Sequence, residues 1–173
     1  MSKQLYNIAL VPIESNFVEN LIKYAQEKFL KYQNGYILSN NAALPHITLC
    51  HFYSNYEDLV LIWQLIAKEF IDTYLIEFDG VYLNTGSNEH KGSIWSGLTM
   101  RRQAKIDQLQ ARICEVLSIH SYKSLTSTGE SYFPHLTFAR LQNNPALKYQ
   151  YENFFTKSYL FKGSLGVSNK IGE

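Results

Sequence analysis

Two short segments of the sequence carry the same unusual combination of residues. Residues 44–52 read LPHITLCHF and residues 133–141 read FPHLTFARL, so a Pro-His-x-Thr motif occurs twice. Its histidines, His46 and His135, lie 89 positions apart (135 − 46). With five histidines and four prolines in the chain, chance would give only roughly 0.005 such motifs. The repetition therefore indicates a shared role.

Each motif places an imidazole and a hydroxyl two residues apart in an apolar run that is typical of a strand. Residues i and i+2 of a strand project from one face, so His46 projects with Thr48 and His135 projects with Thr137. Because histidine titrates near neutrality, one imidazole can accept a proton while the other donates one. Threonine hydroxyls can bind the phosphoryl oxygens on which charge develops. We predict acid–base catalysis at a phosphodiester by the two histidines, with a purely structural role as the alternative.

An even or odd offset from His46 predicts which face of the strand a nearby residue occupies, and the remaining histidines lie outside the predicted strands. His51 has an odd offset from His46, so on an unbroken strand we expect it to face away from the site. Cys50 shares the parity of His46, and we expect it either to line the cleft or to be a small buried residue. His90 and His120 fall in predicted loops or helix ends, where solvated side chains are expected.

Further candidates are an arginine and several aromatic residues. Arg140 has the opposite parity to His135, but its long side chain and planar guanidinium make it a candidate phosphate ligand. A surface ion pair is the alternative for Arg140. If the substrate is a nucleotide, an aromatic ring should stack on its base. Four residues are candidates for stacking, with ordinary packing as the alternative for each: Tyr132, Tyr53, Trp95 and Tyr36.

Composition narrows the classes of partner. The net charge is +1, without the basic stripe of proteins that bind duplex DNA. A small nucleotide or an RNA terminus is therefore the expected partner. The motifs offer no cluster of histidines and carboxylates, so we expect neither a metal nor another cofactor. The two cysteines form no CxxC pair, and no signal peptide or span of 18 apolar residues occurs. We expect a reduced, monomeric, cytoplasmic protein that does not enter a membrane.

The elements that must position the motifs follow a repeating order. A capping box, Ser54-Asn55-Tyr56-Glu57, predicts the start of a helix. Asp79-Gly80 predicts a bulge or a tight turn within a strand. In the first half, the periodicity predicts a strand over 5–13, a helix over 16–33 ended by Asn34-Gly35, a strand over 46–53, a helix from the capping box to residue 70, and a strand over 73–84.

The second half repeats this order. Asn144-Pro145 predicts a helix with proline at its first position. The other patterns predict a strand over 92–99, a helix over 101–118, a polar loop over 120–132, and strands over 135–141 and 159–167.

Each half therefore reads β-α-β-α-β with its His-x-Thr at the middle strand. Corresponding helices start 86 residues apart (102 − 16) and 90 residues apart (145 − 55), close to the spacing of the histidines. We predict a single α+β domain over 1–173, built from two pseudo-twofold related lobes at about 1–86 and 87–173. A central cleft between the lobes would bring His46 and His135 together.

Two His-x-Thr motifs on strands, half a small domain apart, resemble those of the 2H phosphoesterase superfamily. Its members include bacterial 2′–5′ RNA ligase-like proteins and RNA 2′,3′-cyclic phosphodiesterases. The segment PHLTFARL matches closely, whereas the residues after Thr48 depart from the apolar run closed by glycine that ligase-like proteins have. The resemblance implies a bilobal α+β fold with largely antiparallel sheets, helices outside, and both motifs in the cleft.

The resemblance also implies an activity. We expect metal-independent hydrolysis of a 2′,3′-cyclic phosphate, on an RNA end or a nucleotide, to a 2′-phosphate, with reverse 2′–5′ RNA ligation as a side activity. One alternative keeps the site and changes the substrate to 2′–5′ oligoadenylate or cyclic oligonucleotide signals. Another is a non-catalytic nucleotide- or RNA-binding module, although a pure binder has no need of two proton-transfer groups. Which histidine is the acid and which is the base stays open.

Overall fold

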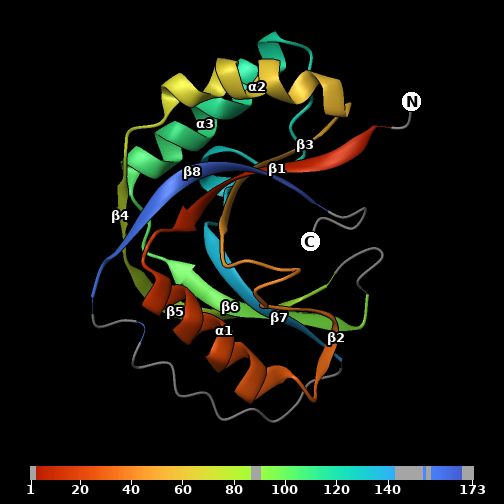
Figure 1. The fold of residues 1–173 in the computed structure, drawn as a ribbon, viewed down its shortest axis with the longest axis vertical. Coiled ribbons are helices and arrows are strands. Elements are labelled where there is room, and N and C mark those ends of the chain that lie inside the picture. Colours follow the sequence, from red (N-terminus) through yellow and green to blue (C-terminus); the bar gives the residue numbers. More distant parts are fainter. Residues whose placement is uncertain (1–2, 87–90, 143–153, 155–156, 169–173) are drawn as a thin grey trace.

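The computed structural model describes residues 3–86, 91–142, 154 and 157–168 (Figure 1). In chain order the main elements are β1 (Gln4–Pro12), α1 (Ser15–Phe29), β2 (Gln33–Ile37), β3 (Ile47–Ser54), α2 (Leu59–Ile66), β4 (Tyr74–Ile76), β5 (Phe78–Thr85), β6 (Ser93–Met100), α3 (Ala104–Ile119), β7 (His135–Gln142) and β8 (Tyr159–Val167). Short 3-10 turns cover Tyr56–Asp58, Ala67–Glu69 and Gly129–Ser131.

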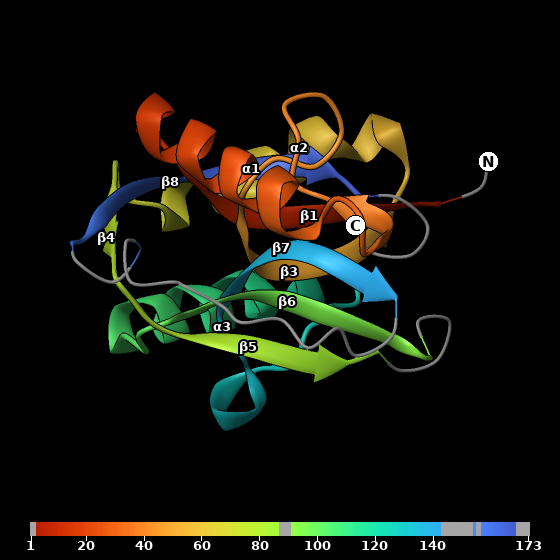
Figure 2. The same cartoon turned by 90° about the horizontal axis from the view of Figure 1, so that it is seen from below.

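The strands form one sheet in the order β4-β8-β1-β3-β7-β6-β5, and β2 also pairs with β7. The strand pairs of the described residues are antiparallel. Figure 2 shows β5, β6 and β7 side by side on one half of this sheet. The predicted α+β class with largely antiparallel pairing is confirmed.

The two motif strands meet at the centre of the sheet. β3 and β7 pair only through Ile47 and Leu136, and beyond this point the two halves of the sheet diverge (Figure 1). Outward from the centre, β3-β1-β8 on one side corresponds to β7-β6-β5 on the other. The architecture is therefore two similar halves joined at the motifs.

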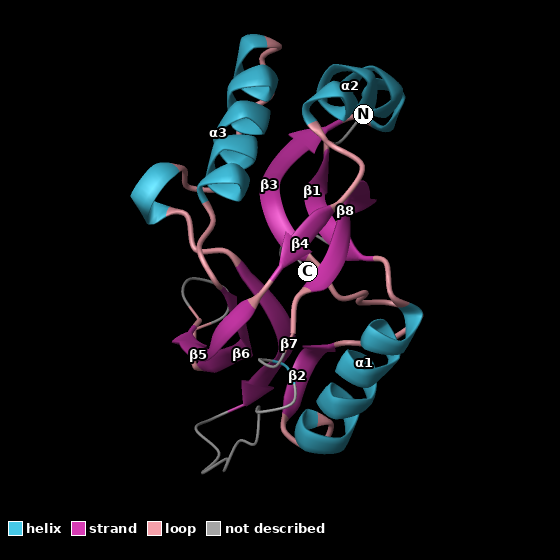
Figure 3. Ribbon diagram, turned by 90° about the vertical axis from the view of Figure 1, so that its left-hand side faces the viewer, coloured by secondary structure: helices cyan, strands magenta, loops and turns pink. Residues whose placement is uncertain are grey.

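The halves in space are not the halves of the sequence. β8, from the end of the chain, pairs with β1 and β4, whereas β2, from the start, pairs with β7. Helices cross in the same way, because α1 follows β1 but packs on β7, and α3 follows β6 but packs on β3. Figure 3 shows α2 and α3 at one end of the molecule and α1 at the other. Each half of the sheet thus contains strands from both halves of the sequence.

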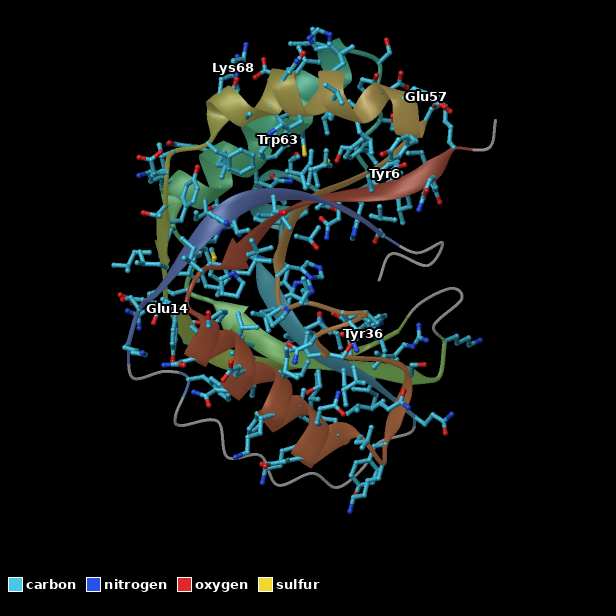
Figure 4. The ribbon with its side chains drawn as sticks, in the orientation of Figure 1. Tyr6, Glu14, Tyr36, Glu57, Trp63 and Lys68 are labelled. Atoms are coloured by element: carbon cyan, nitrogen blue, oxygen red, sulfur yellow. The ribbon has the colours of Figure 1, made fainter. Side chains whose placement is uncertain are left out.

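Apolar stripes hold the helices to the sheet. The buried face of α1 runs from Phe17 to Phe29 at helical spacing, and the ring of Phe17 stacks on Tyr159 of β8 with centroids 3.6 Å apart. In α2, Trp63 stacks on Phe70, and Figure 4 shows Trp63 on the side of α2 that faces α3 and the sheet. Burial of these faces is the main favourable term that fixes the sheet and hence the motifs.

Several predicted elements need correction. The first helix ends at Phe29 rather than at residue 33, because 33–37 form β2, which pairs with β7. Ser54 does not cap a helix, since its hydroxyl bonds Asn55 and Asp58, and the segment begins with a 3-10 turn.

The predicted strand over 73–84 is two strands that pair with different neighbours. β4 pairs with β8 and β5 pairs with β6. The register between β5 and β6 shifts between Phe78 and Gly80, which confirms the predicted bulge. The helix predicted at 144–145 lies outside the described residues. Of the helices that the structure describes, none has the length and hydrophobicity to cross a membrane.

Candidate active site

A cavity of about 400 Å³ opens where the two halves of the sheet meet. All four motif residues, His46, Thr48, His135 and Thr137, line it. Because β3 and β7 are antiparallel with Ile47 opposite Leu136, the register sets His46 near Thr137 and Thr48 near His135. The structure therefore brings together the two motifs that the sequence separates by half its length.

Both histidines are anchored in the same way. Nδ1 of His46 lies 2.8 Å from the carbonyl oxygen of Leu44, and Nδ1 of His135 lies 2.7 Å from the carbonyl oxygen of Phe133. A carbonyl only accepts, so Nδ1 must carry the hydrogen in each ring. Nε2 is then the atom that exchanges protons with a ligand.

Burial keeps both rings neutral near pH 7. It lowers the pKa of His46, and the bond to Leu44 offsets part of this effect. Burial also lowers the pKa of His135, opposed by the bond to Phe133 and reinforced by the charge of His46. The effect of the His46 charge on His135 indicates that the two rings lie within electrostatic range. In the free protein, both Nε2 atoms are therefore poised to accept a proton.

Each threonine is held by a polar side chain from another strand of the sheet. Nδ2 of Asn7 donates to Oγ1 of Thr48 across 3.1 Å, which leaves the Thr48 hydroxyl hydrogen free for a ligand. The hydroxyl of Tyr82 lies 2.5 Å from Oγ1 of Thr137, and burial raises the pKa of Tyr82, so it stays a neutral phenol. Neither residue was predicted, although Asn7 is a polar residue in the otherwise apolar run 5–13.

A bulge in β3 overturns the parity argument for His51. Ile8 pairs with Cys50 but Ala9 pairs with Thr48, so Leu49 is an extra residue. His51 is thereby turned to the face of Thr48 and lines the cavity, and the expectation that it faces away is wrong. Cys50 is instead fully buried and bonds Ser124, so of its two expected roles the structural one is confirmed.

A second bulge occupies the same place in the other motif strand. Ser96 pairs with Ala139 but Gly97 pairs with Thr137, which makes Phe138 the extra residue. Arg140, five positions after its motif histidine as His51 is after His46, is turned to the cavity face opposite Trp95.

Arg140 nevertheless lies behind the cavity wall. Its guanidinium carbon is 5.4 Å from the centre of the Trp95 ring, and the side chain runs beneath Gly35, where an added Cβ would meet Nη2. It is largely buried and is not among the residues that line the cavity. The surface ion pair considered as the alternative does not describe this buried position.

The predicted stacking residues divide into two groups. Tyr36, Trp95 and Tyr132 line the cavity, whereas Tyr53 is an exposed residue outside it. Tyr36, labelled in Figure 4, packs on Trp95 with ring centroids 5.6 Å apart. The Tyr132 hydroxyl donates to the carbonyl oxygen of Thr48 across 2.8 Å, so this ring supports the first motif directly.

Phe133 is an aromatic residue of the site that was not predicted. Its ring is 44% exposed, lines the cavity, and stacks on His135 at 25° with centroids 5.1 Å apart. Its position before Pro134 and the motif histidine was the available signal. Of the other histidines, His120 is exposed at the end of α3, as expected, and His90 lies outside the described residues.

The described cavity wall combines aromatic and polar side chains but carries no fixed charge. Among the described lining residues there is no lysine, arginine or carboxylate. Nor do three or more His, Cys, Asp and Glu side chains of the described chain gather in a way that would hold a metal ion. Positive charge at the centre of this cavity can therefore come from protonation of its histidines.

A second hollow of about 280 Å³ also borders His46. His46 and Tyr36 belong to both walls, so the two hollows adjoin. Its wall is built by small side chains of β1 and β8 and by the segment before the first motif, with Ala9, Ala43 and Ser164 among them. His46 thus borders both hollows.

Comparisons with known proteins agree with this architecture. Residues 20–168 match the sequence model of the 2'-5' RNA ligase superfamily. No curated protein matches the sequence. The fold is similar to that of E. coli LigT complexed with phosphate, with a TM-score of 0.62 and 16% identity over 100% of this chain and 92% of that one.

Two further crystal structures show the same likeness. E. coli LigT complexed with 3'-AMP gives a TM-score of 0.65 and 15% identity over 97% of this chain and 90% of that one. The MHV ns2 PDE domain gives a TM-score of 0.52 and 14% identity over 94% of this chain and 99% of that one. At these identities the likeness shows a shared fold.

Proposed function

Because the chain belongs to the 2'-5' RNA ligase superfamily, we propose that it is a metal-independent phosphodiesterase that opens a 2′,3′-cyclic phosphate to a 2′-phosphate. The observation that carries this proposal is the pair of identically anchored histidines, each with Nε2 as its reactive nitrogen, in one cavity. A nucleotide or an RNA terminus is the substrate class, in keeping with the 3'-AMP complex of the structurally similar LigT.

Proton transfer follows from the anchored rings. One histidine takes a proton from water through Nε2 as the water oxygen bonds to phosphorus. The bond from phosphorus to the ribose 3′ oxygen breaks, and the other histidine gives that oxygen its proton. One ring must therefore be neutral and the other charged, and their titrations are coupled.

The bound phosphate explains how one of the two neutral rings becomes protonated. Both rings are neutral in the free protein, but a bound phosphodiester anion favours the charged form of an adjacent imidazole. Substrate binding would thus load one ring with the proton that it later donates. The hydroxyls of Thr48 and Thr137 would bind the non-bridging oxygens, each oriented by its partner, Asn7 or Tyr82.

The test is hydrolysis of 2′,3′-cyclic AMP in excess EDTA, with the products separated as 2′-AMP and 3′-AMP. The proposal expects hydrolysis to 2′-AMP at a rate that EDTA leaves unchanged. Formation of 3′-AMP would contradict the proposed direction of ring opening, and loss of activity in EDTA would contradict metal independence.

A second candidate is cleavage of an internal 2′–5′ linkage, as in 2′–5′ oligoadenylate. The hollow beyond His46 favours it, because such a phosphodiester carries a nucleoside on each side of phosphorus. In that substrate the second nucleoside would occupy this hollow. Comparing kcat/KM for a 2′–5′ linked diadenylate and for 2′,3′-cyclic AMP distinguishes the two. The Ala43→Trp variant, which fills the hollow, should impair only the former.

A further inference from the structure

His51 is a third histidine in the wall of the catalytic cavity. The bulge at Leu49 turns it inward, and both the amide and the carbonyl of its backbone are bonded to the adjacent segment 125–126, which also lines the cavity. Its amide donates to Oγ1 of Thr126 across 2.9 Å, and its carbonyl oxygen accepts from the amide of Leu125 across 2.8 Å. The imidazole is therefore held in a fixed place beside the site.

One nitrogen of the His51 ring lacks a hydrogen-bond partner among the described residues. Its Nε2 is buried and has no hydrogen-bond partner in the part of the chain that the structure describes. Buried polar atoms are satisfied in the great majority of native proteins, and an exception calls for a specific reason. In the wall of a binding cavity, the simplest reason is that a ligand provides the missing hydrogen bond.

The charge state of His51 differs from that of the catalytic pair. Burial, and then the positive charges of His46 and His135, lower its pKa to about 4. His51 is therefore neutral wherever the catalytic pair exchanges protons. A neutral imidazole offers one N–H donor and one nitrogen acceptor, and it lacks the charge–charge attraction that would favour a phosphate over a neutral group.

Neutral groups of a nucleotide are the matching chemistry. The edge of a nucleobase presents donors and acceptors side by side, and it needs aromatic surface for its faces. The cavity that His51 lines also contains the rings of Trp95, Tyr36 and Phe133. The hydroxyls of Thr126 and Ser127 lie on the same wall as His51.

We propose that His51 is a specificity-determining residue that hydrogen-bonds the nucleobase of the substrate while the catalytic pair holds the phosphate. This inference rests on the proposed function for its substrate class. It assigns to the third histidine the selection of the base rather than proton transfer.

The test compares wild type with His51→Phe, which keeps an aromatic ring but removes both nitrogens, and with His51→Gln, which restores a donor and an acceptor. His120→Phe, at an exposed histidine, is the matched control. For each protein, kcat and KM are measured with the four 2′,3′-cyclic nucleotides, together with Kd for the four nucleoside 2′-monophosphates.

Wild type and the control should prefer one base by about tenfold in kcat/KM, because an unpaired polar group in a site penalises the wrong ligand. His51→Phe should reduce this preference to within about threefold, mainly through KM. His51→Gln should restore a preference, and each variant should keep a bell-shaped pH profile. An unchanged preference in His51→Phe, an equal loss of kcat with all four bases, or a wild type without preference would overturn the inference.

Failure of the proposed function is separable from failure of this inference. If wild type binds the monophosphates but hydrolyses no cyclic nucleotide, the proposed hydrolysis fails, and the Kd values decide the role of His51. If wild type neither binds nor hydrolyses any of them, both are overturned.

Discussion

At the scale of single residues, the proline of each motif explains how the motif histidine ring is fixed. Pro45 and Pro134 stand between the histidine and the residue whose carbonyl holds its Nδ1. A residue before proline is restricted to extended conformations, which fixes the direction of that carbonyl. The repeated Pro-His-x-Thr pattern therefore encodes an oriented imidazole with a defined tautomer.

The threonine supports give the first prediction. Tyr82→Phe and Asn7→Ala each remove one hydrogen bond to a motif threonine. A net value of about 1 kcal/mol for such a bond corresponds to a roughly fivefold lower kcat, with a smaller change in KM. Steady-state kinetics on 2′,3′-cyclic AMP measure this effect. Tyr53→Phe, at an exposed tyrosine outside the cavity, is the control, and wild-type kcat in both support variants would refute the assigned roles.

The histidine pKa values give the second prediction. Burial lowers the pKa of both His46 and His135, so the form with one proton on the pair is most populated below the ordinary value of about 6.5. The profile of kcat/KM against pH should be bell-shaped with its maximum below pH 6.5, whereas the maximum of kcat should lie higher because bound phosphate raises these values. A maximum of kcat/KM above pH 7.5 would contradict this order.

At the scale of elements, a residue on a helix holds the bulge that shapes the site. Nε2 of Gln110, fully buried on α3, lies 3.2 Å from the carbonyl oxygen of Leu49 and 3.1 Å from that of Ser127. One amide thus joins the extra residue of β3 to the segment opposite His51. The orientation of His51 depends on α3 as well as on its own strand.

Gln110→Leu gives the third prediction. Leucine fills a similar volume but removes the donor from the buried carbonyl of Leu49 and from the carbonyl of Ser127, which costs about 2 kcal/mol of unfolding free energy. Base preference should weaken as well, because His51 and its facing segment lose their common tie. Urea denaturation and kinetics with the four cyclic nucleotides measure both effects. Gln108→Leu, exposed on the same helix, should match wild type, and an equally small loss in both variants would rule out this role.

The motif strands show which features of the site could be predicted from the sequence and which could not. Repetition identified His46, Thr48, His135 and Thr137, because the motif is local and its strand periodicity is strong. Counting parity failed at His51 because it assumes an unbroken strand, and the bulge is held by a residue 61 positions away.

The pairing of strands that are distant in the sequence could not be predicted either. The last strand, β8, was predicted with its bounds, but its place beside β1 rather than in its own half of the sequence depends on contacts that no local pattern records. Strand β2 was missed because the helix pattern was continued to residue 33, and the pairing of β2 with β7 is a long-range contact that no local pattern records.

At the scale of the whole molecule, the buried histidines connect the site to acid stability. The unfolded chain binds protons at histidine near pH 6.5, whereas folded His51 does so only near pH 4. Its folded pKa is depressed, so its contribution is complete above pH 6.5 and is lost as the pH falls toward 4. At pH 5 this loss amounts to at most about 2 kcal/mol from His51 alone.

Denaturation at two pH values gives the fourth prediction. The urea midpoint of wild type should fall between pH 7.5 and pH 5, and His51→Phe should show a smaller fall because phenylalanine does not titrate. His120→Phe, at an exposed histidine, should keep the wild-type dependence. A dependence in His51→Phe as steep as that of wild type would show that His51 is not held neutral by the fold.

The central claim, that two histidines from distant motifs form one acid–base pair, is tested most directly by single-turnover hydrolysis of 2′,3′-cyclic AMP. The comparison uses wild type, His46→Ala, His135→Ala, the double variant, and His120→Ala as the exposed control. Each single substitution should lower the rate by about 10³-fold, and the double variant should be scarcely slower because the two residues act as a unit. A near-wild-type rate in either single variant, or losses that multiply in the double variant, would contradict the account.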